Sequence, residues 1–379
     1  MNNIKKSKKT QIAILQNRVN VGGRSKVVAE IIQTLDKKNL CPDVLSFSTD
    51  AEIDNFASNY NLQGYFKHIR ILPIGWNKGT TYQMPILNLS ARNKLKQYDF
   101  VINSNNVPYL LPEGPKYLHY MHFPPEAAFE YNERLKSSLK MKAYTSPLKF
   151  LYSVLSLNEK KSIFLANSEF TKKRILEFYD FEDKEVSVVY PPCLDNIDVS
   201  DNYSSSSKVV SLGSFTPNKR QLDQIEIAKQ LPNLEFSIIG MNKNTDYFDK
   251  CQSVVDEEGL ENVNLFPDLE WSLVKKKLDQ AEFFLHTMHN EPFGIATVEA
   301  IFKGCLPIVH NSGGQKEIVH QKRLRFNSVK EAVTTLQTVK NMDYSDKRNS
   351  LKQLQESLDQ YTKTKFQEKI SRQISKITT

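Results

Sequence analysis

The sequence has few cysteines, and their arrangement marks neither a disulfide framework nor a zinc site. The four cysteines, Cys41, Cys193, Cys251 and Cys305, are scattered along the chain, and none belongs to a CxxC pair. The seven histidines form no cluster with the spacing of metal ligands. Free thiols in a reducing compartment are therefore expected, and no bound metal or cofactor is expected.

Long hydrophobic runs are also missing. The apolar run after the basic N-terminus, from Ile12 to Leu15, is too short for a signal peptide or a membrane span. With 40% hydrophobic residues and 13 glycines, the 379-residue chain has the composition of a soluble globular protein with two domains. We expect a cytoplasmic location.

Acidic residues are too few to balance the basic ones. The chain has 51 lysines and arginines against 43 acidic residues, which gives a formal net charge of +8. Such a charge favours an anionic partner, which is a nucleotide diphosphate, an anionic membrane surface or nucleic acid. Nucleic acid is not expected, because the sequence contains no basic-aromatic motif of a known binding module.

Predicted strands and helices alternate along the chain, which indicates an α/β protein with parallel sheets. Strands are expected at 11–16, 43–47, 68–72, 99–103, 116–121, 162–166 and 186–189, and then at 208–212, 235–239, 263–266, 282–286 and 306–309. Two prolines at 191 and 192, followed by a polar run that ends in four serines, mark a linker. We therefore place the N-terminal domain at 1–195 and the second domain at 196–362.

The stretch 289–300 is the most informative part of the chain. It places Glu291 on a loop after a predicted strand and Glu299 in the helix that follows, with seven residues between them. The helix N-terminus offers unpaired N–H groups to a diphosphate, and Gly294 lets the backbone come close to it. Glu299 lies about 6–8 Å further along the axis, within reach of a ribose. The residues expected to contact a nucleotide sugar here are Glu291, Phe293, Gly294, Ile295 and Glu299.

This motif resembles the paired-glutamate signature of retaining GT-B glycosyltransferases of family 4, in particular the mannosyltransferases that extend lipid-linked oligosaccharides. The resemblance implies two doubly wound Rossmann-like domains that face a cleft, with the helix 363–379 packing back on the first domain. It implies retaining transfer of a hexose, mannose from GDP-mannose, to a glycan or lipid-linked glycan. The leaving phosphate would accept the proton of the acceptor, so Glu291 would bind the donor sugar or stabilise the positive transition state. No metal site of the Asp-x-Asp kind appears where this fold would use one, so metal independence is expected.

The segment 211–220 resembles the glycine-loop-lysine element of the same family. Lys219 is expected to neutralise the departing diphosphate, with Arg220 as a further donor contact. Many family members carry an arginine directly after the glycine, where this chain has Ser214. The lipid-linked mannosyltransferases often carry one two residues later, where this chain has Thr216. Arg220 either compensates for these differences or points to solvent.

Three segments of the first half are also candidates. Gly22 and Gly23 precede a helix, where the backbone can approach phosphate or sugar. His119 and His122 flank a strand end in a segment that resembles the His-Phe-Pro segment of these mannosyltransferases. Because a strand alternates its faces, we expect His122 in the cleft, as a catalytic candidate, and His119 in the core. Asn167, and His289 in the second half, are candidates for the acceptor or sugar pocket, although Ser168 beside Asn167 is also typical of a helix N-cap.

The segment 131–162 mixes lysines with bulky apolar residues. It is either a face that lies on an anionic bilayer or an ordinary buried helix pair, and it is too short and too polar to span a membrane. The protein would then be peripheral on the cytoplasmic face of a membrane.

Other functions are compatible with the same fold. One is a glycosyltransferase that uses a UDP-sugar for a soluble or cell-surface glycan. Another is a catalytically silent GT-B scaffold protein, which Ser214 and Thr216 would suit. Signatures of a sugar-nucleotide 2-epimerase are not apparent in the sequence.

Overall fold

The computed structural model describes residues 10–72, 80–131, 139–155, 162–179, 181–196 and 203–378. The chain forms two compact units. The first is built mainly from the chain up to Pro192 together with Lys363–Thr379, and the second mainly from Cys193–Thr362. The division after Pro192 lies three residues before the end of the expected first domain at 195. Part of the expected linker, residues 197–202, lies outside the described residues.

The first unit contains a seven-stranded parallel sheet with the order β3-β2-β1-β4-β5-β6-β7. Its strands are β1 (Ile12–Leu15), β2 (Asp43–Ser46), β3 (Lys67–Arg70), β4 (Phe100–Asn103), β5 (Lys116–Met121), β6 (Ser162–Ala166) and β7 (Val186–Val188). The helices are α1 (Gly23–Asp36), α2 (Asp50–Tyr60), α3 (Thr80–Leu95), α4 (Pro125–Tyr131), α6 (Leu139–Val154), α7 (Glu169–Phe178) and α15 (Lys363–Thr378). All residues of β1 and β4 are buried, as expected for parallel strands covered on both faces.

The second unit contains a six-stranded parallel sheet with the order β10-β9-β8-β11-β12-β13. Its strands are β8 (Lys208–Leu212), β9 (Glu235–Gly240), β10 (Val263–Pro267), β11 (Phe283–His286), β12 (Leu306–His310) and β13 (Arg325–Phe326). The helices are α8 (Gln221–Lys229), α9 (Thr245–Glu257), α10 (Trp271–Gln280), α11 (Ile295–Phe302), α12 (Gln315–Ile318), α13 (Val329–Lys340) and α14 (Tyr344–Gln355). Short 3-10 turns lie at Asp183–Glu185, Pro217–Lys219, Lys322–Leu324 and Leu358–Tyr361.

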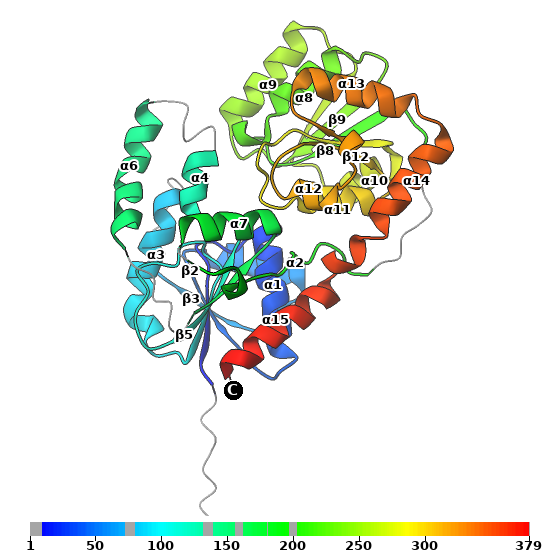
Figure 1. Ribbon diagram of the computed structural model, residues 1–379. Helices are drawn as coiled ribbons and strands as arrows, with labels where there is room; N and C mark the ends of the chain where they lie inside the picture. The colour runs from blue at the N-terminus through cyan, green and yellow to red at the C-terminus, as the bar shows by residue number, and fades with distance from the viewer. Residues whose placement is uncertain are drawn as a thin grey trace, which may run out of the picture. The chain divides into compact units, whose positions relative to one another are not determined.

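The C-terminal helix α15 packs against α1 of the first unit (Figure 1). Phe366, Ile370 and Ile374 share a buried cluster with the apolar face of α1. At the edge of this contact, Lys363 Nζ lies 3.1 Å from Glu30 Oε1, and Gln367 donates to Glu30 Oε2 at 2.7 Å. The helix therefore joins the far end of the chain to the first sheet.

A buried ion pair joins Glu282, the residue before β11, to Lys347 of α14 in the second unit. Lys347 Nζ lies 2.7 Å from Glu282 Oε1, and the two side chains are 8% and 4% exposed. The Tyr203 hydroxyl donates to the same carboxylate oxygen at 2.6 Å. The buried charges are therefore paired and hydrogen-bonded, which is the condition under which a protein interior tolerates them.

All four cysteines are free, and three of them are buried. Among the residues that the structure describes, no helix is long and apolar enough to cross a membrane.

Candidate active site

The candidate site lies at the topological switch point of the second sheet. Strands β8 and β11 are neighbours there, and the chain continues from them to strands on opposite sides, β9 and β12. In open α/β sheets, ligands bind outside the carboxyl ends of the strands at such a point. The loop after β8 leads to Lys219, and the loop after β11 leads to Glu291.

The loop after β8 is seated directly on the end of β9. Gly213 N donates to Ile239 O at 2.9 Å, and Phe215 N donates to Met241 O at 2.9 Å. At Gly240, an added Cβ would lie 1.9 Å from the Gly213 carbonyl oxygen. Only glycine at this position permits so close an approach of the two backbones.

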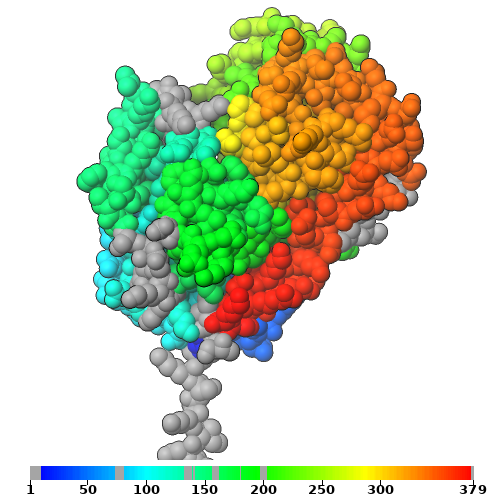
Figure 2. Space-filling view, in the orientation of Figure 1, coloured from blue at the N-terminus to red at the C-terminus, as the bar shows by residue number. Residues whose placement is uncertain are grey.

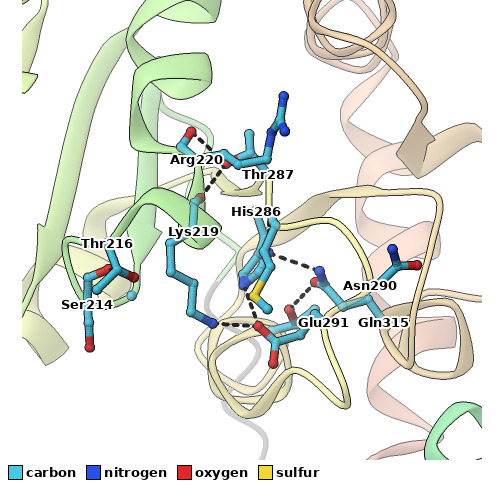
Figure 3. Close-up of polar contacts among 12 residues, drawn as sticks. Ser214, Thr216, Lys219, Arg220, His286, Thr287, Asn290, Glu291 and Gln315 are labelled. Atoms are coloured by element: carbon cyan, nitrogen blue, oxygen red, sulfur yellow. Dashed lines mark hydrogen bonds and ion pairs between the residues drawn. The ribbon is translucent and has the colours of Figure 1, made fainter. Parts of the chain in front are cut away.

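Thr287, the residue after β11, holds the backbone that carries Lys219. Its hydroxyl lies 3.0 Å from the Lys219 carbonyl oxygen and 3.2 Å from that of Arg220, and it accepts a hydrogen bond from Gln224 at 3.0 Å. The Lys219 side chain runs across Gly213, since a Cβ added there would meet Lys219 Cδ at 3.4 Å. Loop, strand end and helix α8 together fix the direction of the lysine (Figure 3).

The loop that carries Glu291 is seated on the glycines after β12. Gly314 N donates to Glu291 O at 2.8 Å, and Asn290 N donates to Ser312 Oγ at 2.7 Å. An added Cβ at Gly313, whose φ is +72°, would lie 2.4 Å from Glu291 O. The turn at 311–314 is therefore the support of the acidic loop, and helix α12 begins directly after it at Gln315.

Lys219 and Glu291 form an ion pair with 2.5 Å between Nζ and Oε2. The two side chains are 24% and 14% exposed, so the pair is partly shielded from water. Burial alone raises the pKa of Glu291, but the Lys219 ammonium and the neighbouring His286 ring outweigh burial and hold that pKa well below its usual value. The carboxylate is therefore ionised at neutral pH and carries a full negative charge beside a positive one.

Two polar side chains lie behind Glu291 that the sequence did not single out. His286, at the end of β11, has Nε2 3.5 Å from Glu291 Oε2, and its Nδ1 lies 2.9 Å from Gln315 Nε2. Both side chains are buried. Burial lowers the pKa of His286, an effect that the Glu291 carboxylate partly opposes, so the ring is neutral at neutral pH. A histidine at a strand end was the available sequence signal, but its partner is far away in the chain.

The N-terminus of α11 has the geometry that a glycine permits. Gly294 is the N-cap, with φ of +114°, and the helix begins at Ile295. Phe293 is buried and packs edge-on against Tyr361, with ring centroids 5.4 Å apart. Glu299 lies in α11 and is half-buried. The amides of the first turn of α11 thus follow directly after the acidic loop.

Arg220 is directed away from the Lys219–Glu291 pair. It forms an ion pair with Asp223, 2.7 Å away in α8, and its backbone is left-handed with φ of +58°. Its guanidinium points to the opposite side from the Lys219 ammonium (Figure 3). The Thr216 hydroxyl donates to the Ser214 carbonyl at 3.3 Å, so these two residues close the turn. The structure therefore does not place Arg220 where it would replace the missing arginines.

Both candidate histidines of the first unit are buried. His119 is 2% exposed and lies 3.1 Å from the Asn103 amide, and His122 is 9% exposed with Nε2 3.1 Å from Ser104 Oγ. Burial lowers the pKa of each to about 3, and a contribution from Arg24 adds to this at His122. The alternation of strand faces did not separate them, because both faces of a parallel sheet are covered.

The other candidates of the first unit lie at helix starts. Gly22 is the N-cap of α1 with φ of +145°, Gly23 is the first residue of that helix, and the space beside Gly22 is open. Asn167 is 5% exposed, and its Oδ1 has no hydrogen-bond partner among the described residues. Ser168 is the N-cap of α7 and accepts from Thr171 N, as one of the two interpretations predicted.

His289 is the last of the candidate residues. The His289 ring stacks on His310 in the second unit, with centroids 3.7 Å apart. Among the described residues, no group of three or more His, Cys, Asp or Glu side chains is arranged to hold a metal ion.

The whole chain resembles solved glycosyltransferase structures. HepE from Anabaena, solved in complex with UDP-glucose, has 16% sequence identity to this chain and a TM-score of 0.68, and the match covers 97% of this chain and 99% of HepE. WaaG, a glycosyltransferase involved in lipopolysaccharide biosynthesis, also has 16% identity and a TM-score of 0.68, and the match covers 96% of this chain and 99% of WaaG. The chain has the GT-B fold, as the sequence predicted.

Sequence comparison finds a match to a protein family in the second part of the chain. Residues 195–365 match the family Glycosyl transferases group 1. The chain is 31% identical over 207 residues to the GDP-Man:Man(3)GlcNAc(2)-PP-Dol alpha-1,2-mannosyltransferase of Xenopus laevis, a match that covers 50% of this chain and 42% of that protein. The chain thus spans less than half the length of that relative. The expected resemblance to lipid-linked mannosyltransferases is confirmed.

Proposed function

We propose that the protein is a retaining glycosyltransferase that moves mannose from GDP-mannose to a lipid-linked glycan. The observation that carries this proposal is the Lys219–Glu291 ion pair, with 2.5 Å between Nζ and Oε2, at the switch point of the second sheet. The names of the relatives supply the sugar, the base and the acceptor class, because the Xenopus laevis relative is named as a GDP-Man-dependent mannosyltransferase for a dolichol-linked glycan.

The geometry assigns a different task to each charge. Lys219 and the first amides of α11 offer positive charge to the diphosphate, whose negative charge grows as the glycosidic bond breaks. Glu291 stays ionised beside the lysine and faces the sugar, where it binds hydroxyls or stabilises the positive charge that develops on the ring. The glycosidic bond to the diphosphate breaks, the bond to the acceptor oxygen forms, and the leaving phosphate takes the acceptor proton.

Purified protein incubated with GDP-mannose and a lipid-linked oligosaccharide should release GDP and lengthen the acceptor. Glu291→Gln removes the charge at nearly constant volume and should lower turnover by about a hundredfold or more, as expected for loss of a preorganised electrostatic contact. The matched control is Glu258→Gln, which removes a carboxylate from the surface pair with Lys229 in the same unit. Equal turnover in the two variants would contradict the assigned role of Glu291.

A UDP-sugar is the second candidate donor. Its support is the likeness to a structure solved with UDP-glucose. A donor panel with GDP-mannose, UDP-glucose and UDP-N-acetylglucosamine separates the two proposals by their rates of nucleotide release. A third result, no release from any donor, would favour a scaffold protein that keeps the fold without the reaction.

We propose that the reaction needs no divalent metal. Lys219 and the N-terminal amides of α11 stand where a cation would otherwise neutralise the diphosphate. Turnover should therefore be the same in excess EDTA as in its absence. A loss of activity in EDTA that magnesium or manganese restores would overturn this part of the proposal.

We also propose that α6 rests on an anionic membrane surface, which would place the protein on the cytoplasmic face of a membrane. Leu139, Phe150 and Val154 are 85%, 71% and 62% exposed. At about 100° per residue these three lie within about 60° of one another around the helix. Helix α6 forms part of the surface of the first unit (Figure 2). The free cysteines are compatible with that reducing compartment.

The other side of α6 is the one that packs on the first unit. Thr145, Leu148 and Tyr152 are buried, and the Tyr152 ring stacks on Tyr109 with centroids 5.3 Å apart. Between the buried and apolar exposed sides lie Lys142 and Lys149, which are also exposed. An apolar stripe flanked by lysines is the arrangement that binds acidic headgroups.

Vesicle flotation tests the membrane proposal. The protein should float with phosphatidylcholine vesicles that contain phosphatidylglycerol at low salt, and Phe150→Ser combined with Val154→Ser should abolish this. Leu89→Ser on α3 is the matched control, since Leu89 is also an exposed apolar residue, at 55%. Flotation of the double variant equal to that of the control would contradict the role of α6.

A further inference from the structure

A chain of buried polar side chains runs from the interior of the second unit to Glu291. Thr297 on α11 donates through its hydroxyl to Gln315 Oε1 at 2.8 Å. Gln315 on α12 lies 2.9 Å from His286 Nδ1 through its Nε2, and His286 Nε2 lies 3.5 Å from Glu291 Oε2 (Figure 3). Thr297 and Gln315 are 0% exposed and His286 is 4% exposed, so water does not compete for these contacts.

The hydrogen bonds decide which ring nitrogen of His286 carries the proton. Nδ1 faces two donors, the Gln315 amide and the backbone N–H of Met288 at 3.3 Å. A nitrogen that accepts from two donors is unprotonated, so the single proton of the neutral ring is on Nε2. That N–H lies beside the Glu291 carboxylate, with Nε2 3.5 Å from Oε2.

Gln315 is oriented in turn by its own surroundings. Because the Met288 N–H makes Nδ1 an acceptor, the NH₂ group of Gln315 faces the histidine, and the Gln315 oxygen accepts from the Thr297 hydroxyl. An added Cβ at Gly294 would lie 3.1 Å from Gln315 Cγ and 3.3 Å from Thr297 Oγ1. The glycine that caps α11 therefore leaves room for Thr297 and Gln315. The chain of buried polar side chains is thus built into the same turn that presents the amides of α11.

Lys219 and His286 address the same oxygen of Glu291, Oε2, at 2.5 Å and 3.5 Å. When Lys219 turns its charge to a diphosphate, as the proposed function requires, Glu291 loses its strongest counter-charge. The carboxylate then depends on its remaining fixed donor to stay ionised and to keep its direction.

We propose that His286, held in its Nε2–H form by Gln315 and Thr297, is the positioning residue that aims the Glu291 carboxylate at the donor sugar while Lys219 serves the diphosphate. This inference rests on the proposed function for its kinetic consequence, but the proton position in His286 can be measured without it. The residue acts through Glu291 and takes no part in bond making or breaking.

Two histidine variants separate the two ring nitrogens. His286→Gln keeps an N–H donor near the place of Nε2, whereas His286→Asn keeps a polar group near the place of Nδ1 and loses the donor toward Glu291. The Asn variant should lose about ten- to a hundredfold in kcat, the range seen when the orienting partner of a functional group is removed, with a much smaller change in KM for the donor. The Gln variant should recover most of this loss.

Gln315→Glu provides a second measurement that does not depend on turnover. A carboxylate at this position accepts a hydrogen bond instead of donating one, so it should pull the proton to Nδ1 and turn the Nε2 lone pair toward Glu291. Long-range ¹H–¹⁵N NMR spectra of protein labelled in the histidine rings report the protonated nitrogen, and the His286→Asn spectrum assigns the signal. The expected result is an Nε2–H ring in the unmodified protein and an Nδ1–H ring in the Gln315→Glu variant.

The outcomes distinguish this inference from the proposed function. An Nδ1–H ring in the unmodified protein overturns the inference even if the enzyme is active. Equal kcat in the Asn and Gln variants of an active enzyme also overturns it. If the unmodified protein shows no turnover, the proposed function is overturned. The NMR result then decides by itself whether Gln315 and Thr297 hold His286 in its Nε2–H form. Circular dichroism of each variant shows that the fold is retained.

Discussion

A methyl group at position 240 should displace the loop that carries Lys219. A Cβ at Gly240 would lie 1.9 Å from the Gly213 carbonyl oxygen and 2.7 Å from its carbon, and both atoms belong to backbone. Ordinary contact begins at 3.4 Å, so the loop after β8 must move by about 1.5 Å in Gly240→Ala. No rotation of a side chain can relieve this contact.

The size of the effect follows from that displacement. A misplacement of about 1 Å near a reacting centre costs about a hundredfold in rate, so kcat for the transfer should fall by about that factor. Overpacking of this kind also lowers the free energy of unfolding by about 1–3 kcal/mol. Transfer from GDP-mannose and a thermal melt of the same preparation measure the two effects.

The control for this substitution is another glycine of the second unit. Gly259 has φ of +59°, and a Cβ added there meets nothing within 4 Å. Gly259→Ala should therefore lower the melting temperature slightly, by strain alone, and leave kcat unchanged. If Gly240→Ala has the kcat of the control, the close seating of the two backbones does not position the lysine and the reasoning fails.

Two ion pairs give the remaining predictions. Lys347→Met should lower the free energy of unfolding by about 3–5 kcal/mol, because it leaves the Glu282 carboxylate buried without its counter-charge. Adding Glu282→Met to the same chain should restore most of the lost stability. A denaturant titration measures both effects. Glu291→Gln should lower stability at neutral pH, because the folded protein holds the Glu291 pKa below its unfolded value of 4.5. That stabilisation is present above the unfolded pKa and disappears as the pH falls. The melting temperatures of the unmodified protein and of Glu291→Gln should therefore converge in acid.

Each of these has a result that would contradict it. A Lys347→Met protein as stable as the unmodified one would mean that the buried carboxylate is not left charged. A stability difference between Glu291→Gln and the unmodified protein that grows as the pH falls would have the wrong sign for an ion pair with Lys219.

The sheet strands were readable from the sequence because each is a short apolar run bounded by turn residues. The predicted strands at 116–121, 162–166 and 208–212 match β5, β6 and β8 at both ends. Strand β13 (Arg325–Phe326) was missed, since two residues are too few to show a period. The helix expected after Glu291 was found because a glycine precedes it, and it runs from Ile295 to Phe302.

The site was only partly readable, for a different reason. Lys219 and Glu291 each lie in a recognisable motif after a strand, and the parallel topology brings these two strands together. His286 and Gln315 belong to no motif. They lie 29 positions apart in the chain, so their pairing depends on how the segments after β11 and β12 pack together. The direction of Arg220 also could not be read, because it is set by a left-handed residue and the nearby Asp223.

Nucleoside diphosphate binding tests the central claim most directly, which is that a pyrophosphate is held by Lys219 at the switch point of the second sheet. Calorimetric titration with GDP, UDP and ADP should show that at least one of them binds the unmodified protein. At a hundred times its dissociation constant, that ligand should add about 2.7 kcal/mol to stability. Lys219→Met should lose this binding, while Lys229→Met, which removes a surface lysine of the same unit, should retain it. Binding of equal strength to both variants, or of none of the three diphosphates to the unmodified protein, would contradict the account.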